Sequence, residues 1–355
     1  MAPTMMKAAV CKEVGQPLVI EEVPVPKPEG RHLLVRVQVA SLCHSDVSIV
    51  TGAVLGGPPV PLIIGHEAIS VVEELGPDAA KYGIKVGDRV GTPLWQDWCF
   101  ECYECKEIAP QFCPKITMKG VNAPGYFCEY TTVDAATAVV IPENTPASPV
   151  QLSPIFCAGV TVWDALSRAC LKPGETLAVV GVGGLGEIAT KYAQALGVKV
   201  VGIDVRDEQL IGVKEGGSAD EILNSRDLKL TEVKERVREL NKGRGVDAAV
   251  VTSGSKPAYL TALNILRAEG RLMAVGIPGE YVPINMGLVA TQAIKIIGAK
   301  VPGQIGTAAC LDFCHRKGIY PKVHPRKFQL EDINEMMDLM KAGKVDDGRM
   351  AVQFF

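Results

Sequence analysis

The chain has 355 residues, which predicts about two domains at roughly 150 residues each. Its composition, 47% apolar and 22% charged, is that of a globular protein and excludes a disordered chain. With 37 basic and 40 acidic residues the net charge is −3, so neither nucleic acid nor an anionic membrane is an expected partner.

No segment predicts a membrane span or a targeting signal. The uncharged apolar stretch 176–186 is far shorter than the ~20 residues that cross a bilayer. The N-terminal residues lack the long apolar core of a signal peptide. We therefore expect a cytoplasmic protein, in which thiols stay reduced. Its 11 cysteines are then expected to be metal ligands, catalytic groups or buried thiols rather than disulfides.

The first 150 residues predict a β-rich region, because residues 34–39 alternate in polarity and 68–73 and 89–91 follow turn residues. From about Cys157 the pattern changes to short apolar runs separated by helical segments. Such alternation predicts an α/β fold with a parallel, doubly wound sheet. The expected strands are 176–180, 199–203, 221–223, 247–251, 271–275 and 294–297.

A helix is predicted between the first two of these strands. Its apolar face is formed by residues at spacings of three, four, seven and eleven, namely Leu185, Ile188, Ala189, Tyr192 and Leu196. A second helix is expected near 331–341, followed by a strand near 350–354.

A glycine-rich turn joins the first strand to the first helix of this α/β region. The turn fits the pattern G-x-G-x-x-G, in which the glycines permit a tight bend and let backbone N–H groups approach a pyrophosphate at the helix N-terminus. Its residues are Gly181, Gly183, Gly184, Leu185 and Gly186.

The next strand ends in Asp204, 18 residues beyond Gly186, where a carboxylate can accept a hydrogen bond from the 2′-hydroxyl of a ribose. Asp204 would repel a 2′-phosphate, which favours NAD over NADP. Arg206 keeps NADP as the minor alternative. The alternative to a nucleotide site is a turn that serves packing alone.

Four cysteines lie within one short segment with the spacing C-x2-C-x2-C-x7-C. Four thiolates at this spacing can enclose one zinc ion tetrahedrally and leave no open position, which predicts a structural metal site. The four are Cys99, Cys102, Cys105 and Cys113.

A second set of possible metal ligands is scattered along the chain. It consists of Cys43, His66 with the neighbouring Glu67, and Cys157. Three protein ligands and a water molecule form an open, Lewis-acidic zinc site. Taken singly, Cys43 or His66 is better explained as a core residue, and only the pattern beside a nucleotide site favours a metal.

At these residues the chain resembles the zinc-dependent alcohol dehydrogenases of the medium-chain dehydrogenase/reductase superfamily, and most of all their fungal, yeast-type branch. The resemblance spans the whole chain. It rests on the segments 43–46, 65–67, 99–113, 156–161, 181–186, 275–277 and 348–349. It implies a Rossmann NAD-binding domain at 155–297 and a β-rich, GroES-like catalytic domain with a zinc lobe at 1–154 and 298–355.

The resemblance also implies the roles of individual residues. Cys43, His66 and Cys157 would bind the catalytic zinc, with Glu67 as a transient ligand, and Asp46 would orient His66. Ser45 would accept the proton of the alcohol. Two zinc ions per chain are expected, one catalytic and one structural.

Further residues are expected to contact NAD(H) or the substrate. His44 and Arg349 would face the cofactor phosphates. The other expected NAD(H) contacts outside the glycine turn are Thr161, Asp204, Val275, Ile277 and Val301. The expected substrate pocket includes Trp95, Val54 and Leu55.

Three positions depart from the pattern of the family. Ser48 stands where the proton relay commonly ends in a histidine, so the relay through Ser48 would deliver the proton to water. Gln209 replaces a lysine that often follows the ribose-binding acid. Val54 replaces the pocket tryptophan of yeast-type enzymes, which predicts room for a substrate larger than ethanol.

These observations predict NAD(H)-dependent interconversion of an alcohol and its aldehyde or ketone. A polyol dehydrogenase is the nearest alternative, although such relatives tend to have a carboxylate at the position of Cys157. A catalytically silent NAD-binding sensor is the alternative from another class, because a fold alone does not establish activity. By analogy with relatives we expect a homo-oligomer, either a tetramer or a dimer.

Overall fold

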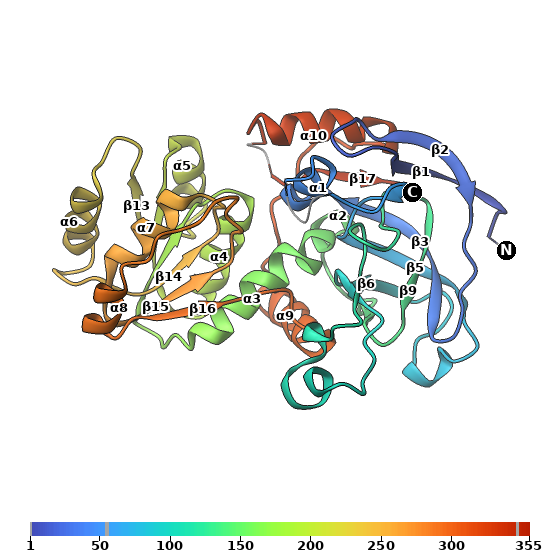
Figure 1. The fold of residues 1–355 in the computed structure, drawn as a ribbon, viewed down its shortest axis with the longest axis horizontal. Helices are drawn as coiled ribbons and strands as arrows, with labels where there is room; N and C mark the ends of the chain where they lie inside the picture. The colour runs from blue at the N-terminus through green and yellow to red at the C-terminus, as the bar shows by residue number, and fades with distance from the viewer. Residues whose placement is uncertain (1, 54–56, 346–347) are drawn as a thin grey trace. The chain divides into compact units, whose positions relative to one another are not determined.

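The computed structural model describes residues 2–53, 57–345 and 348–355 (Figure 1). Val54 and Leu55, two of the expected pocket residues, lie outside the described residues. Contacts between residues divide the chain into two compact units, Met1–Val160 with Val301–Phe355, and Thr161–Lys300. Helix α3 (Ala158–Ala169) contains the point at which the chain passes from the first unit to the second.

The first unit is built on antiparallel sheets. Its main sheet has the order β10-β6-β5-β3-β17, and β9 also pairs with β3. These strands are β3 (His32–Ser41), β5 (Ala68–Leu75), β6 (Arg89–Thr92), β9 (Tyr130–Asp134), β10 (Val139–Val140) and β17 (Ala351–Gln353). A three-stranded sheet contains β1 (Met5–Cys11), β2 (Val19–Pro24) and β4 (Leu62–Ile63), and a two-stranded one contains β7 (Trp95–Gln96) and β8 (Thr117–Met118).

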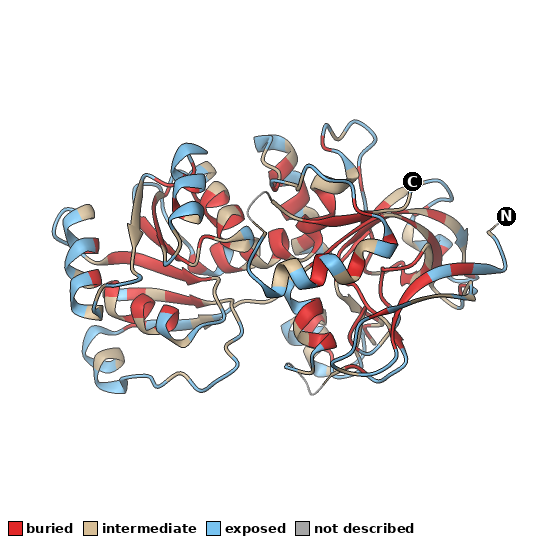
Figure 2. Cartoon of the chain, turned by 90° about the horizontal axis from the view of Figure 1, so that it is seen from above, coloured by how far each residue is buried: buried red, intermediate tan, exposed pale blue. Residues whose placement is uncertain are grey.

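Strand β3 is the centre of this unit because it pairs with three other strands. Most of its residues are buried (Figure 2). Apolar side chains of the main sheet, of the three-stranded sheet and of later segments of the chain pack around it. The helices of the unit are α1 (His44–Val50), α2 (Pro149–Leu152), α9 (Gln304–Lys317) and α10 (Ile333–Lys341). A single 3-10 turn, Ser153–Phe156, leads from α2 to Cys157.

The position of Cys157 depends on a close contact between Phe156 and Gly91. The Phe156 ring is completely buried, and a Cβ atom at Gly91 would lie 2.0 Å from that ring. Only glycine therefore allows the 3-10 turn to pack this closely on β6. This contact fixes the backbone immediately before Cys157.

The second unit is an open parallel sheet of six strands in the order β13-β12-β11-β14-β15-β16. Numbered within the unit this is 3-2-1-4-5-6, the strand order of a dinucleotide-binding doubly wound fold, as the sequence predicted. The strands are β11 (Thr176–Val180), β12 (Lys199–Asp204), β13 (Glu221–Asn224), β14 (Val246–Val251), β15 (Leu266–Ala274) and β16 (Lys295–Gly298).

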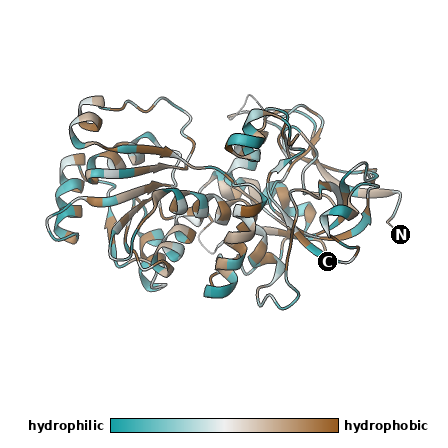
Figure 3. Ribbon diagram, turned by 90° about the horizontal axis from the view of Figure 1, so that it is seen from below, coloured by the Kyte–Doolittle hydropathy of each residue, from teal (hydrophilic) through white to brown (hydrophobic). Residues whose placement is uncertain are grey.

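Helices connect these strands, and the apolar residues of the unit follow the central strands (Figure 3). All residues of β14 are buried, as expected for a strand covered on both faces. The helices are α4 (Gly184–Ala195), α5 (Asp207–Glu215), α6 (Leu230–Leu240), α7 (Lys256–Ile265) and α8 (Met286–Gln292).

Two residues of the expected apolar helix face are not part of the core, and one of them, Leu185, is half-buried. Ile188, Ala189 and Tyr192 are buried on α4 as predicted, but Leu196 follows the end of the helix and is 37% exposed. The helix ends here because Gly197 adopts a left-handed conformation with φ of 77°. Elsewhere, β15 begins at Leu266, five residues before the strand expected at 271.

Among the described residues, no helix combines the length and apolar character needed to cross a membrane.

Candidate metal centres and nucleotide-binding turn

The scattered set of possible ligands comes together in the first unit. The ligand atoms of Cys43, His66, Glu67 and Cys157 all lie within 4.8 Å of one another. Cys43 stands immediately before α1, and His66 and Glu67 lie between β4 and β5. Cys157 follows the 3-10 turn. Three segments that are distant in sequence therefore supply the donors of one site.

Asp46 orients two of these donors from the first turn of α1. Its Oδ2 accepts a hydrogen bond of 2.9 Å from the backbone N–H of Cys43, and its Oδ1 lies 2.7 Å from His66 Nδ1. Asp46 is completely buried. If His66 Nδ1 carries its proton toward the carboxylate, Nε2 is left with a lone pair for a metal ion.

Glycines bring the backbone before His66 into close contact with a neighbouring segment. Gly65 has φ of 100°, a left-handed conformation that side chains disfavour. A Cβ atom at Gly125 would lie 2.3 Å from the Gly65 carbonyl oxygen. The short motif of glycine, histidine and glutamate therefore reflects packing as well as ligand chemistry.

The charges of this cluster fit a metal ion. A hydrogen bond between the two thiols lowers the pKa of Cys43 well below its usual range, against the effect of burial, and raises the pKa of Cys157. Burial would lower the pKa of His66, but the Asp46 carboxylate outweighs burial and raises it. Two thiols that compete for one proton beside an oriented imidazole form the Cys2His donor set that zinc prefers in open sites.

Glu67 is bound to other residues of the chain. Its two carboxylate oxygens accept hydrogen bonds of 2.5 and 2.7 Å from Arg349 Nη2, and Ser41 Oγ donates a third bond of 2.5 Å to Oε2. Complete burial raises the pKa of Glu67 to about 7, although Arg349 opposes this shift. Arg349, expected at a cofactor phosphate, here holds Glu67, and a contact with phosphate remains a prediction.

The four cysteines of the short segment also come together, with ligand atoms within 4.8 Å of one another. The sulfur of Cys99 lies 3.9 Å from that of Cys105 and 3.6 Å from that of Cys113. Backbone N–H groups of Glu101 and Cys102 donate to Cys99 Sγ and lower the pKa of this thiol to about 6. A set of four sulfur donors, one already poised as a thiolate, fits tetrahedral zinc.

A polar network that the sequence did not reveal attaches this lobe to the main sheet. His32 Nε2 lies 2.7 Å from Asp97 Oδ1, and the Asp97 N–H donates to Asp134. Arg31 forms two bonds of 2.7 Å with the same Asp134 carboxylate and a third with the Trp98 carbonyl oxygen. His32 and Asp97 are 65 residues apart, and no local pattern signals their pairing.

The glycine-rich turn of the second unit has the geometry of a phosphate-binding loop. Gly181 adopts φ of 93°, and a Cβ atom at Gly186 would lie 1.9 Å from the Gly181 carbonyl oxygen. A Cβ atom at Gly183 would meet nothing within 4 Å, and Gly183 caps α4 without a side-chain hydrogen bond. The helix N-terminus is thus open to an anion.

Asp204 stands at the end of β12 and is fixed by three backbone groups. Its Oδ2 accepts from the N–H of Val182 at 2.7 Å, and its Oδ1 accepts from Val205 at 2.7 Å and from Arg206 at 3.0 Å. Because a carboxylate offers about four acceptor positions, capacity remains for a ribose hydroxyl. The bond to Val182 links Asp204 directly to the glycine turn.

The remaining predicted residues fall into the two units separately. On α1, His44 and Ser45 are exposed, and Ser48 Oγ lies 3.4 Å from His44 Nδ1. Trp95 Nε1 donates to the Val301 carbonyl oxygen at 2.9 Å within the first unit. The other expected NAD(H) contacts, which belong to the second unit, are Thr161, Val275 and Ile277.

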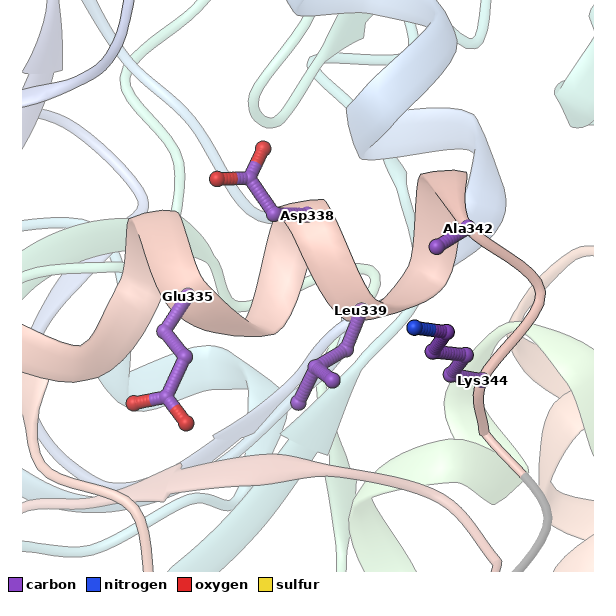
Figure 4. A pocket seen from close by; sticks show the side chains of 5 residues that line it. All are labelled: Glu335, Asp338, Leu339, Ala342 and Lys344. Atoms are coloured by element: carbon purple, nitrogen blue, oxygen red, sulfur yellow. The ribbon is translucent and has the colours of Figure 1, made fainter.

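A surface hollow lies beside α10 (Figure 4). It is lined by Glu335, Asp338, Leu339, Ala342 and Lys344. None of these residues belongs to either donor cluster, and the hollow contributes nothing to the site described above.

Comparisons with known proteins agree with this arrangement. Residues 29–143 match the family model described as alcohol dehydrogenase GroES-like domain, and residues 184–316 match the model described as zinc-binding dehydrogenase. An alcohol dehydrogenase of Geobacillus stearothermophilus is 36% identical, over 98% of this chain and 99% of the relative. An alcohol dehydrogenase of Moraxella sp. (strain TAE123) is 32% identical, over 98% of this chain and 99% of the relative.

The fold is also that of a solved structure. The alcohol dehydrogenase of the hyperthermophilic archaeon Aeropyrum pernix superposes with a TM-score of 0.87 at 28% identity, over 98% of this chain and 100% of that chain. The chain therefore belongs to the zinc-type alcohol dehydrogenase family of the medium-chain dehydrogenase/reductase superfamily. Members of this family are oxidoreductases that act on alcohols.

Proposed function

We propose that this protein is a zinc-dependent alcohol dehydrogenase that transfers a hydride between an alcohol, or its aldehyde or ketone, and NAD(H). The observation that carries this proposal is the convergence of Cys43, His66 and Cys157 in a chain that also has an open glycine turn followed by Asp204. A metal site with three donors and a dinucleotide turn are the two parts that such a reaction requires.

The residues of the proposed catalytic centre have distinct tasks. When bound, zinc would polarise the substrate oxygen and the nicotinamide would accept or donate the hydride. Cys43, His66 and Cys157 hold the metal and leave one position for the substrate. Asp46 fixes the orientation of the His66 ring through its bond to Nδ1.

Proton transfer belongs to the exposed polar residues of α1. Ser45 Oγ would accept the proton of the alcohol and pass it toward the cofactor ribose. At the end of the relay Ser48 Oγ, which cannot store a proton as a histidine would, would pass it on to water. His44 and Arg349 are proposed to contact the phosphates of the cofactor. The exposed positions of His44 and Ser45 support this assignment, since both side chains are accessible to a ligand.

The second metal is proposed to be structural. Cys99, Cys102, Cys105 and Cys113 would bind one zinc ion with no position left for substrate, so two zinc ions per chain are expected. Asp204 supports a preference for NAD, because its carboxylate can accept a ribose hydroxyl and repels a 2′-phosphate. Thr161, Val275, Ile277 and Val301 complete the proposed cofactor contacts.

Cellular setting and assembly are part of the same proposal. We assign the chain to the yeast-type branch because of the resemblance of its motifs, among them the segments 43–46 and 156–161. By analogy with relatives, we also propose that it is a cytoplasmic homo-oligomer. Light scattering of the purified protein would measure the assembly, for which a tetramer or a dimer is expected. A monomer at micromolar concentration would contradict it.

One experiment tests the proposed activity. Zinc content is measured on protein prepared with ample zinc, and NADH formation is followed with primary alcohols, secondary alcohols and polyols. Two zinc ions per chain with turnover of simple alcohols are expected. Turnover of polyols alone would favour the polyol dehydrogenase, and zinc-loaded protein that binds NADH without turnover would favour a silent sensor.

A further inference from the structure

Two buried serines contact Glu67, although neither belongs to the donor cluster. Ser41 ends β3 and Ser153 begins the 3-10 turn, 112 residues later. Both residues are completely buried, and their hydroxyl oxygens lie 2.8 Å apart. The hydroxyl pair is joined to the site through Glu67.

The pair binds both the side chain and the backbone of Glu67. Ser41 Oγ donates to Glu67 Oε2 at 2.5 Å, and Ser153 Oγ donates to the Glu67 carbonyl oxygen at 3.1 Å. The backbone N–H of Ser41 donates to Ser153 Oγ at 3.1 Å. Because Ser41 Oγ gives its proton to the carboxylate, the single proton of Ser153 Oγ goes either to Ser41 Oγ or to the Glu67 carbonyl oxygen, and in both cases it supports the residues that hold the carboxylate.

That carboxylate competes with the substrate for a metal ion. A Glu67 oxygen lies within 4.8 Å of the ligand atoms of Cys43, His66 and Cys157. An anionic oxygen this close is attracted to a cation bound by the other three. Arg349 and Ser41 hold the carboxylate by hydrogen bonds.

We propose that Ser41, supported by Ser153, is a positioning residue that keeps the Glu67 carboxylate on Arg349 and off the metal, so that the fourth coordination position stays open for the substrate oxygen. The inference rests on the proposed catalytic zinc. Ser41 acts by holding Oε2 in place with the hydrogen bond that it donates. Ser153 acts by preventing Ser41 Oγ and the Glu67 backbone from shifting.

Replacement by alanine removes this restraint without adding charge or bulk. In Ser41→Ala, Oε2 keeps only its bond to Arg349 and becomes free to turn toward the metal. Ser153→Ala leaves the Ser41 donor present but unsupported, so a smaller effect in the same direction is expected. A hydrogen bond to a charged group is worth enough to change the balance between the two positions of Glu67 about tenfold.

The fourth ligand of the metal is the readout that separates positioning from simple stability. Cobalt(II) replaces zinc, and the visible absorption of each variant is compared with that of the unmodified protein, so that the unchanged four-cysteine site cancels. We expect the visible bands of Ser41→Ala to shift, because a carboxylate oxygen would replace water as the fourth ligand of the cobalt. Imidazole, a ligand with a single donor nitrogen, should bind the cobalt about tenfold more weakly.

A matched control tests the loss of a buried hydroxyl pair elsewhere. Ser218 is buried in the second unit, where Thr190 Oγ1 donates to its Oγ at 2.9 Å. Ser218→Ala should lower stability to a similar extent yet leave the cobalt spectrum and imidazole affinity unchanged. In a Glu67→Gln background, Ser41→Ala should likewise have little effect, because the competing carboxylate is gone.

The outcomes are distinct. An unchanged spectrum and imidazole affinity in Ser41→Ala would overturn the inference while leaving the proposed function intact. If Ser41→Ala does not fold, the same two measurements on Ser153→Ala decide the question. Unmodified protein that takes up no metal at the three-donor site, or that turns over no alcohol, would instead contradict the proposed function.

Discussion

Asp46 connects the backbone of one metal donor to the ring of another. One oxygen of this buried carboxylate accepts the N–H of Cys43, and the other lies against His66 Nδ1. An N-cap interaction and a ligand orientation are therefore two uses of the same group. Any change of Asp46 alters both the start of α1 and the direction of the His66 ring.

Asp46→Asn should weaken zinc binding at the three-donor site by about 10- to 100-fold, because an amide cannot accept at both positions. Competition with a chelator measures this affinity. Asp312→Asn is the control, since Asp312 is an exposed residue of α9 paired only with Arg316 at 2.7 Å in the described structure. Equal zinc retention in the two variants would show that the Asp46 contact does not orient a ligand.

Lys119 is a buried cation in the first unit. It is 3% exposed, and its Nζ donates to Thr131 Oγ1 at 2.8 Å and to the Thr132 carbonyl oxygen at 2.9 Å. Burial lowers its pKa from 10.5 to about 8. Between pH 8 and pH 10.5 Lys119 is protonated in the unfolded chain and neutral in the folded chain. Protonation therefore favours the unfolded chain as the pH falls through this range.

The free energy of unfolding should therefore rise with pH from about 8 to 10.5, by roughly 2 to 3 kcal/mol from Lys119 alone. Below pH 8 this contribution is a constant penalty, and above 10.5 it vanishes. Lys119→Met removes the dependence, because methionine does not titrate. Denaturant unfolding of both proteins at pH 8 and pH 10 measures the difference. Parallel pH profiles would contradict the assignment.

At the scale of elements, the β11–α4 turn and the end of β12 together form the proposed nucleotide-binding site. Gly181 and Gly186 let α4 start against the strand, and the Asp204 carboxylate is bonded to the N–H of Val182 within the same turn. The acid is therefore placed before any ligand arrives. Such preorganisation lowers the entropy cost of binding.

Asp204→Ser should narrow or reverse the preference for NAD over NADP, since it removes both a ribose acceptor and a repelling charge. The ratio of kcat/KM for the two cofactors is the measurement. Asp207→Ser, three residues farther on at the first position of α5, changes the same net charge without touching the turn and should leave the ratio unchanged. Equal use of NADP by the unmodified protein would assign the choice to Arg206 instead.

The four-cysteine lobe is the other element whose stability is proposed to depend on a ligand. Between β7 and β8 the chain forms a five-residue π-helix, Glu104–Ile108, and a single 3-10 turn, Pro110–Phe112. Of its four cysteines only Cys113 is buried, so we expect a metal to replace the apolar core that a segment of this size lacks. The His32–Asp97 pair attaches the lobe to β3 but does not close it.

Cys105→Ser should lower zinc content by one ion per chain and reduce the Tm, while the surviving folded molecules keep their turnover. Metal analysis, thermal unfolding and initial rates measure the three effects. Cys170→Ser is the control because Cys170 is exposed in the second unit and should affect none of them. A normal zinc content in Cys105→Ser would contradict a structural metal in the lobe.

At the scale of the molecule, patterns within short segments of the sequence predicted the features that depend on residues close together in the chain. The six parallel strands follow from short apolar runs, and the lobe follows from cysteines within 15 residues of one another. The end of α4 at Ala195 was missed because Gly197 overrides the apolar spacing. Contacts between distant segments were predicted only where the resemblance implied them, as for Asp46 and His66.

The candidate site shows the same division. Cys43, His66 and Cys157 were proposed from the resemblance, but spacing alone did not predict that they meet. The Ser41–Ser153 pair, the Arg349–Glu67 bond and the His32–Asp97 pair have no sequence signal, because each joins residues 65 to 282 positions apart. Tertiary packing, not periodicity, brings them together.

The pairing of β17 with β3 has a consequence for biosynthesis. Ala351 lies opposite Ser41, and Arg349, two residues earlier, supplies the counter-ion of Glu67 from 282 positions away. At about 5–20 residues per second, the ribosome needs roughly 15 to 55 s to make the intervening chain. Throughout that interval the carboxylate has no guanidinium. We therefore expect Glu67 to compete for the metal of the three-donor site until Arg349 has left the ribosome. Stalled nascent chains that end at Gly348 and carry cobalt should bind imidazole more weakly than the unmodified protein, and equal affinity would disprove this order of assembly.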